Sequence, residues 1–346
     1  MDKKLRYGLI GCGDIAKSER TGIVESGNSE LIMVMDANPE FAEKFGKEFN
    51  VPYTSDLKVI LKRKDIDAVV IAVPHFLHKP IAIAAAKKKK HVVIEKPIAT
   101  NIKDARKIIK ACQKNGVKLS VPFVYRYKPA TVKAKELFQK GVIGKVINIS
   151  SIFMGYKPES YWTGGWSQRV STDWRAIKEK SGGGILVMNS IHNIDLLFNI
   201  TGLKAERVYS EYGTFATKVE VEDMVAITLR YDNGAVGCIE ASSTAFGKGE
   251  LVDHIYGTEG QIEMKDDKLR VFTTKAVEGL KANEWNEIPL PEGVNARAAF
   301  TRSFSDAILN NKPLPVTAEE ALQSLEIVFG AYLSGTKKKP VKLPLK

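Results

Sequence analysis

The sequence predicts a two-domain protein, in which a doubly wound parallel α/β sheet precedes an α+β region with antiparallel strands. The 346 residues exceed the usual size of one domain. Residues 1–122 alternate short apolar runs with amphipathic segments, as parallel sheets covered by helices do. Beyond Pro122 the pattern changes to an irregular stretch followed by hairpin signals. We therefore expect domains at 1–122 and 123–346.

The N-terminal strands are expected to be buried on both faces, because their apolar runs are continuous and rich in β-branched residues. These runs are residues 5–10, 31–36, 67–73, 91–95 and 117–121. Between them, Asn38 and Pro39 predict a capped helix start, and Thr100 is the expected cap of a helix over 101–115 that Gly116 ends. Strands and helices alternating in this way imply right-handed crossovers and a parallel sheet.

The second half combines helices with paired strands. A helix over 130–140 precedes the irregular stretch 151–180, the three glycines 182–184 and the apolar segment 185–200. Strands 225–231 and 235–241 flank an Asp-Asn-Gly turn, and strands 252–256 and 261–264 flank a second turn, so antiparallel pairing follows. Helices are expected at 296–309 and 318–333, the latter with a capping box of Thr317 and Glu320.

Composition excludes several classes of protein. The hydrophobic fraction of 44% and the charged fraction of 27% are ordinary globular values, which excludes a mainly disordered chain. Cys12, Cys112 and Cys238 lie far apart, which favours reduced thiols in the cytoplasm over a disulfide framework or a metal site. The N-terminal apolar run is too short for a secretory signal, and no run of eighteen apolar residues exists, so we expect no membrane association.

The net charge of +12 is the unusual number. The densest run is the four lysines at 87–90, which follow an alanine-rich segment where a helix is expected to end. Cations at a helix C-terminus favour the helix dipole, so we interpret this run as a solvated helix end. We therefore expect a small-molecule partner and no nucleic acid.

A glycine loop follows the first strand. It reads G-x-G-x-x-A and includes Gly11, Gly13, Asp14 and Ile15, at the position where a dinucleotide pyrophosphate binds. Asp36 ends the second strand, where an acid accepts hydrogen bonds from the adenosine ribose and repels a ribose phosphate. These features predict a dinucleotide cofactor, with NAD favoured over NADP.

A second group of residues carries a resemblance. Glu95-Lys96-Pro97 ends the strand at 91–95, Pro74 and His78 follow an earlier strand, and His192 and Asp195 follow the three glycines. With the glycine loop, and with residues 141–146 and 173–175, this combination resembles the Gfo/Idh/MocA oxidoreductase family, named for glucose-fructose oxidoreductase and inositol dehydrogenase. The resemblance spans nearly the whole chain.

The resemblance implies a Rossmann domain followed by a domain with an open, mostly antiparallel sheet that forms subunit contacts, hence a homodimer or homotetramer. It implies an enzyme that interconverts a secondary alcohol and a ketone on a sugar, cyclitol or related compound with NAD or NADP. Lys96 matches the family's active-site lysine, with a cis bond before Pro97, and His192 matches its active-site histidine. The cofactor residues expected from the sequence and the resemblance are Gly11, Gly13, Asp14, Ile15, Asp36, Pro74, His75, His78, Glu95 and Lys96.

The expected acid-base pair suits this chemistry. Oxidation of an alcohol requires removal of its hydroxyl proton, which a lysine can accept if burial and the nicotinamide charge lower its pKa from about 10.4 towards about 7–8. His192 can share that proton or orient the substrate.

Two positions depart from the family pattern. Many members have an aspartate four residues before the histidine, whereas this chain has Met188 there and Asn189 next to it. Asn189 can contact substrate but cannot act as an acid or base. His75 stands where asparagine is frequent, and it is expected either to line the nicotinamide site or to face solvent. Asp195 either orients the ring of His192 or caps local backbone.

Aromatic residues and arginines suggest how a hydroxylated ring is held. We expect the substrate to contact a set of polar and aromatic side chains from both domains: Lys96, Arg126, Trp174, Arg175, Asn189 and His192.

Two alternatives stay open. The first is an NAD-dependent glycosidase of the same family, which oxidises, eliminates and then reduces without net redox change. The second is a binder of dinucleotide or sugar that has lost catalysis and serves regulation.

Overall fold

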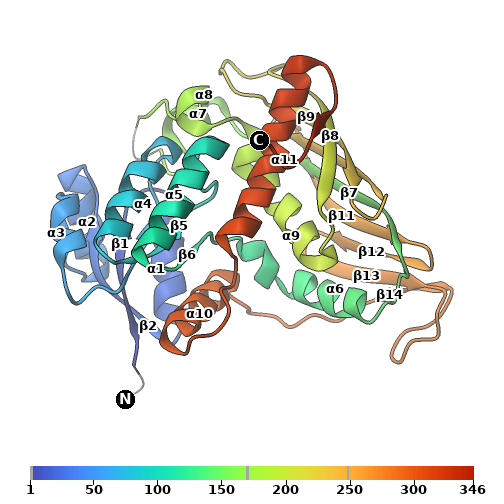
Figure 1. The fold of residues 1–346 in the computed structure, drawn as a ribbon, viewed down its shortest axis with the longest axis horizontal. Coiled ribbons are helices and arrows are strands. Elements are labelled where there is room, and N and C mark those ends of the chain that lie inside the picture. The colour runs from blue at the N-terminus through green and yellow to red at the C-terminus, as the bar shows by residue number, and fades with distance from the viewer. Residues whose placement is uncertain (1–2, 169–170, 248) are drawn as a thin grey trace.

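The computed structural model describes residues 3–168, 171–247 and 249–346. Two sheets stand side by side, each with helices against it, and helix α11 (Ala318–Lys337) runs between them (Figure 1). This arrangement confirms the expected fold class, with a parallel first sheet and a mostly antiparallel second sheet.

The first sheet is a six-stranded parallel sheet with the order β3-β2-β1-β4-β5-β6. Its strands are β1 (Leu5–Ile10), β2 (Ser29–Met35), β3 (Tyr53–Thr54), β4 (Ala68–Ile71), β5 (His91–Ile94) and β6 (Leu119–Ser120). The chain reverses its direction of winding between β1 and β4, and ligands of such sheets bind outside the carboxyl ends of the strands at this point. The glycine loop and Lys96 both lie at this edge.

Helices cover both faces of this sheet. They are α1 (Ala16–Glu25), α2 (Pro39–Phe49), α3 (Leu57–Lys62), α4 (His78–Lys87) and α5 (Ile102–Asn115), with a short 3₁₀ helix η1 (His75–Leu77) before α4.

Local sequence explains how two of these helices begin and end. Asn38 caps α2 as expected, because its side chain accepts a hydrogen bond from the backbone of Glu40 at 2.9 Å. The expected cap of α5 was wrong by one residue. Asn101 has the extended backbone of a cap, and its side chain accepts from the Asp104 backbone at 2.8 Å, so Thr100 lies outside the helix. Gly116 ends α5 with a φ of 66°, as expected.

The second sheet has nine strands with the order β14-β13-β12-β11-β7-β10-β9-β8-β15. Its strands are β7 (Val146–Met154), β8 (Ala205–Gly213), β9 (Met224–Tyr231), β10 (Val236–Ser242), β11 (Glu250–Gly257), β12 (Gly260–Lys265), β13 (Lys268–Thr273), β14 (Glu284–Glu287) and β15 (Val341–Lys342). Both expected hairpins, β9–β10 and β11–β12, are antiparallel, whereas β7 and β10 pair in parallel.

Helices line one side of the second sheet and supply the site. These elements are η2 (Val124–Tyr127), α6 (Pro129–Gln139), α7 (Glu159–Gly164), α8 (Lys178–Ser181), the π-helical turn η3 (Leu186–Ser190) and α9 (Ile191–Thr201). The residues of α9 are almost all buried, which agrees with the apolar run that predicted it.

The last two helices return to the first domain. Helix α10 (Ala296–Leu309) packs against α1, and its Ser305 Oγ lies 2.8 Å from both the hydroxyl of Tyr7 and Oγ of Ser29. Helix α11 begins with the expected capping box of Thr317 and Glu320 and packs against β8, α5 and α9. The C-terminal helices therefore hold the two sheets together around the edge where the glycine loop lies.

Among the residues described, no helix is long and apolar enough to cross a membrane.

The cap of α5 gives a test with a matched control. Replacement of Asn101 by Ala should lower the free energy of unfolding by about 1 kcal/mol, because one backbone donor loses its partner. The neighbouring Thr100→Ala change should stay within about 0.5 kcal/mol. Urea denaturation of both variants measures this, and an equal loss in the two would contradict the placement of the cap.

Candidate active site

The glycine loop leaves space where a phosphate could bind. Gly11 has a φ of 101°, and a Cβ there would lie 2.3 Å from the carbonyl oxygen of Ala72, so only glycine fits. A Cβ on Gly13 would meet no atom within 4 Å. Backbone at Gly13 can therefore approach a ligand at the start of α1, where the helix dipole favours an anion.

Asp36 lies beside this loop at the end of β2. Its carboxylate accepts hydrogen bonds from the backbone of Cys12 at 2.8 Å and of Asn38 at 2.9 Å. A carboxylate offers about four acceptor positions, so two remain for the hydroxyls of a ribose. The loop and the acid together thus fit an adenine dinucleotide.

Asp14 connects the loop to the second domain. Its carboxylate accepts from the backbone of Trp166 at 3.0 Å and from Arg175 at 3.3 Å. Ile15, at the start of α1, is exposed. The segment that contains Trp166 and Arg175 therefore lies against the glycine loop.

The two histidines of η1 and α4 are both buried. His78 is fully buried, with Nδ1 2.9 Å from the Pro97 carbonyl and Nε2 3.1 Å from the Val73 carbonyl. Both ring nitrogens thus contact backbone, so the geometry favours a bracing role over the cofactor contact expected from the sequence. Pro74 begins η1.

His75 is buried as well, so the solvent-facing alternative is wrong. Its Nδ1 lies 2.7 Å from the Ser181 carbonyl, and its ring packs edge-on against Trp174 at 4.5 Å. His75 therefore joins the edge of the first sheet to the segment that leads into the three glycines.

Glu95 belongs to a buried charge network. Its Oε1 accepts from Arg297 of α10 at 2.8 Å, and its Oε2 accepts from the backbone of Lys96 at 3.1 Å. Arg297 also contacts the buried Glu19 of α1. Burial opposes ionisation, but Arg297 lowers the pKa of Glu95 to about 2. Glu95 thus acts as a fixed negative charge beneath Lys96 rather than as an exposed ligand.

Lys96 follows β5, and the bond before Pro97 is cis as expected. Its Nζ donates to the carbonyl of Met188, 2.5 Å away in η3. Burial lowers the pKa of Lys96, and the charges of Arg297 and Arg175 lower it further, although Glu95 opposes them. The neutral amine is therefore more accessible than for an exposed lysine.

His192 stands in the first turn of α9, near Lys96. Its ring stacks on Tyr125 with centroids 4.6 Å apart and meets Phe123 edge-on. Burial and the charge of Lys96 hold its pKa well below the usual value, so the ring is neutral at pH 7. Its buried Nδ1 has no hydrogen-bond partner within the described part of the chain. A buried polar atom of this kind indicates a ligand contact.

Met188 and Asn189 show what replaces the family's aspartate. The Met188 side chain is buried, and its carbonyl accepts from Lys96. The Asn189 side chain accepts a hydrogen bond from Lys157. Both residues lie in η3, and π-helical turns frequently occur at functional sites.

Lys157 is a residue that the sequence analysis missed. It follows β7, is 6% exposed, and its Nζ lies 4.2 Å from the centre of the Tyr161 ring. Burial and the nearby Lys96 hold its pKa well below the usual value. The only signal in the sequence was a lone lysine between a strand and an aromatic segment, which is too common to single out a site.

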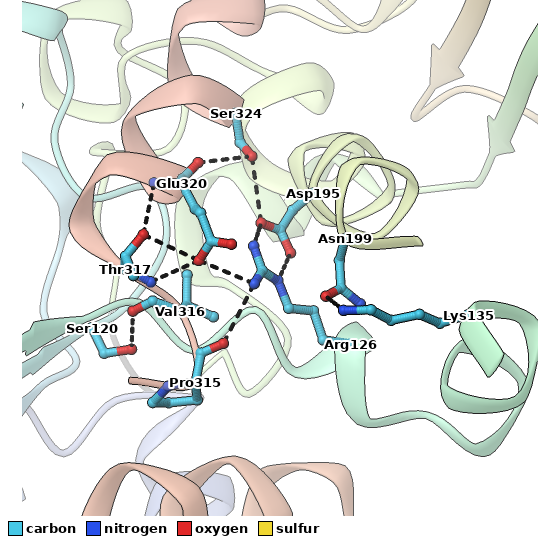
Figure 2. A network of polar contacts seen from close by, with 10 residues as sticks. All are labelled: Ser120, Arg126, Lys135, Asp195, Asn199, Pro315, Val316, Thr317, Glu320 and Ser324. Carbon is cyan, nitrogen blue, oxygen red and sulfur yellow. Dashed lines mark hydrogen bonds and ion pairs between the residues drawn. The ribbon is translucent and has the colours of Figure 1, made fainter. Parts of the chain in front are cut away.

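Arg126 does not take the place expected for a substrate ligand. Its guanidinium forms two bonds of 2.7 Å with the buried Asp195, and its Nη1 lies 3.3 Å from Glu320 and 3.4 Å from the Pro315 carbonyl (Figure 2). Its donors are engaged within the protein, so the geometry favours a structural role that links η2, α9 and α11. Within the described residues, the Asp195 carboxylate bonds to Arg126 and Ser324, and it forms no hydrogen bond with His192 or with a backbone amide.

Trp174 and Arg175 lie beside the glycine loop and the ring of His75. The guanidinium of Arg175 lies 4.6 Å from the Trp174 ring and 5.2 Å from the Tyr161 ring, besides its contact with Asp14. The structure thus brings Lys96, His192 and Asn189 together through η3 and α9, with Trp174 and Arg175 beside His75 and the glycine loop. The side chains of Arg126 and His78 lie nearby but are engaged by other groups of the protein.

Within residues 3–168, 171–247 and 249–346, no group of three or more His, Cys, Asp or Glu side chains is arranged to hold a metal ion.

Comparison with known protein families gives two matches. Residues 5–123 match the oxidoreductase family with an NAD-binding Rossmann fold, GFO_IDH_MocA. Residues 131–263 match the GFO/IDH/MocA C-terminal domain.

Individual relatives extend this result. The 2,7-anhydro-N-acetylneuraminate hydratase of Escherichia coli (strain K12) is 30% identical over 75% of this chain and 67% of its own length. The crystal structure of the WlbA dehydrogenase from Bordetella pertussis with NADH and UDP-GlcNAcA has a TM-score of 0.86 at 27% identity, covering 99% of this chain and all of that one. A levoglucosan dehydrogenase solved with NADH and levoglucosan has a TM-score of 0.89 at 25% identity, with the same coverage of both chains.

The two glycines of the loop make opposite predictions. Gly13→Ala should leave the free energy of unfolding within about 0.5 kcal/mol, because its Cβ meets no protein atom, yet weaken NAD binding at least about tenfold. Gly11→Ala should lower stability by about 1–3 kcal/mol, because of its positive φ and the contact with Ala72. Thermal unfolding and NADH titration measure both effects, and unchanged NADH affinity in Gly13→Ala would contradict the assignment.

Arg126 gives a test of structure against ligand binding. Arg126→Met should lower the free energy of unfolding by about 3–5 kcal/mol, because Asp195 is left buried without its partner. The double variant Arg126→Met with Asp195→Leu should recover part of that loss. Chemical denaturation measures the stability of both variants, and steady-state kinetics measures their KM. An Arg126→Met variant of unchanged stability with a raised KM would indicate that Arg126 contacts the substrate.

Proposed function

Because the chain belongs to the GFO/IDH/MocA oxidoreductase family, we propose that it interconverts a secondary alcohol and a ketone on a sugar or cyclitol, with Lys96 as the general acid-base and His192 beside it. Its coarser assignment is a sugar- or cyclitol-type oxidoreductase that binds NAD. The observation that carries the proposal is the pair of buried bases, Lys96 and His192, at the carboxyl edge of the dinucleotide-binding sheet.

The bound nicotinamide supplies the hydride acceptor or donor. The protein's part is to move the hydroxyl proton. In the oxidising direction, the neutral amine of Lys96 accepts that proton, which its lowered pKa favours. In the reducing direction, its ammonium donates the proton and stabilises the developing negative charge on the oxygen.

His192 contributes in its neutral form. Its ring is fixed between Tyr125 and Phe123, and its low pKa keeps it uncharged. A neutral imidazole can accept a hydrogen bond from the substrate hydroxyl or donate one to it, and thus orients the reacting carbon. The Met188 carbonyl fixes the lysine nitrogen from the other side.

The hydratase relative favours a second candidate. Its name describes addition of water to a sugar derivative rather than net oxidation. A reaction of this kind on the same site, like the glycosidase alternative, would consume substrate without net accumulation of NADH. The non-catalytic binder is disfavoured because Lys96, His192 and the glycine loop are all present.

A nicotinamide absorbance screen tests the proposal. The protein is mixed with NAD or NADP and with inositols, aldoses, sugar acids and their keto forms. Lys96→Ala should lower kcat about 10²- to 10⁴-fold while NADH affinity changes little, because the amine acts on the proton and not on the cofactor. The oxidising rate of the unmutated enzyme should rise with pH to a plateau, with a midpoint below 10.5, because the neutral amine is the active form.

Two results would count against it. Full activity of Lys96→Ala would remove this residue from the reaction. Chromatography measures the substrate directly. If substrate is consumed while the nicotinamide absorbance does not change, the assignment moves to the hydratase or glycosidase type.

A further inference from the structure

The site holds more positive charge than the proposed proton transfer needs. Burial lowers the pKa of both Lys96 and Lys157, and the charge of Arg175 lowers both further. The charge of Lys96 also lowers the pKa of Lys157. Arg175 is balanced by Asp14, and Glu95 offsets part of the charge of Lys96. Within the described residues, Lys157 is left without a carboxylate as an ion-pair partner.

No acid neutralises Lys157. Among the residues that the structure describes, no carboxylate forms an ion pair with it, and its contacts are the Asn189 side chain and the aromatic rings of Tyr161 and Trp162. Glu222 is the acid whose charge favours the ammonium. Its oxygens, however, accept hydrogen bonds from two backbone amides and from the hydroxyl of Tyr332. Burial without an ion pair therefore favours the neutral amine of Lys157, and a negative group of a bound ligand would favour its protonated form.

Unsatisfied polar groups occur on the same segments. Trp162 Nε1, Ser190 Oγ and Ser243 Oγ are buried, and none has a hydrogen-bond partner within the ranges that the structure describes. Trp162 contacts Lys157, Ser190 follows Asn189, and the Ser243 carbonyl accepts from the Lys157 backbone at 2.8 Å. Three donors without a partner thus lie on the segments that adjoin Lys157, and a ligand with several oxygens could supply acceptors for such donors.

Lys157 lies close to the proposed acid-base. Met188 and Asn189 are consecutive residues of η3. The Met188 carbonyl accepts a hydrogen bond from Lys96, and the Asn189 side chain accepts one from Lys157. After burial, the charge of Lys96 is the strongest influence on the pKa of Lys157. A negative group at Lys157 would therefore belong to the same small molecule as the hydroxyl at Lys96.

We propose that Lys157 is a specificity-determining residue that binds a carboxylate of the substrate, so that the enzyme prefers an acidic sugar to its neutral counterpart. The inference rests on the proposed function, because it places this carboxylate on the sugar that Lys96 acts on. Protonation of Lys157 beside an anion supplies one positive charge, which matches the single charge of a carboxylate better than the charge of about two on a phosphate. Met188 supports this choice, since an aspartate at that position would repel the anion.

Binding to the full-length protein with NADH tests the inference without requiring turnover. The probes are D-glucuronate with D-glucose, D-galacturonate with D-galactose, and D-glucose 6-phosphate, each titrated by calorimetry. At least one uronate should bind about ten times more tightly than its aldose, and added sodium chloride should reduce this preference. Lys157→Gln should weaken uronate binding about ten- to a hundredfold with less than about a twofold effect on the aldose, and Lys157→Arg should restore part of it.

A matched control uses the other end of the same strand. Lys145 is exposed just before β7, so Lys145→Gln removes the same charge without touching the site and should leave uronate binding unchanged. Equal binding of uronate and aldose by the unmutated protein would overturn the inference, and this comparison needs no variant. Equal losses for both sugars in Lys157→Gln, or a phosphate that binds more tightly than either uronate, would also overturn it.

The two proposals fail in different ways. Lys157-dependent uronate binding with no turnover that depends on Lys96 would retain this inference and remove the proposed reaction. Turnover that depends on Lys96 without any preference for uronates would do the reverse.

Discussion

The buried guanidinium of Arg297 is the interaction on which the rest of this site depends. It comes from α10 near the end of the chain and contacts Glu19 of α1 and Glu95 at the end of β5. One cation between two buried acids cannot keep both ionised. Glu95 retains its charge, whereas burial and the charge of Glu95 raise the pKa of Glu19 well above its usual value. The helix that packs against α1 thereby fixes the charge directly beneath Lys96.

This network explains how Lys96 can be fixed in position and still have a lowered pKa. Glu95 alone would stabilise the ammonium, but Arg297 opposes it at the same place, so burial prevails and the pKa of Lys96 falls. The same logic extends to Lys157 and His192, where burial and the charge of Lys96 lower the pKa although Glu222 and Glu95 respectively oppose the shift. The site is therefore electrostatically prepared for a ligand that brings oxygen acceptors and negative charge.

The elements that surround the site come from both domains because the chain crosses between them repeatedly. Arg126 of η2 joins α9 to α11 through Asp195 and Glu320 (Figure 2), and Asp14 of the glycine loop binds Arg175 of the second domain. These ion pairs link the edge of the first sheet at the glycine loop to Arg175, and η2 to α9 and α11. In the proposed reaction, the distance that a hydride would cross depends on the relative position of these elements, so these remote ion pairs would act by positioning the reacting groups.

The sequence by itself determined the local features of this protein. The glycine loop, the acid at the end of β2, the hairpin turn before Ala235 and the capping box of α11 all follow from short-range backbone chemistry, which adjacent residues specify. With the family resemblance, it also predicted Lys96 and His192 as the acid-base pair. Only the tertiary structure decided which charges meet. The sequence analysis expected Arg126 to contact substrate, whereas the structure pairs it with Asp195. No local pattern singled out Lys157, which the fold buries beside Asn189. Charge interactions are long-range in sequence and depend on burial, and neither property can be read from neighbouring residues.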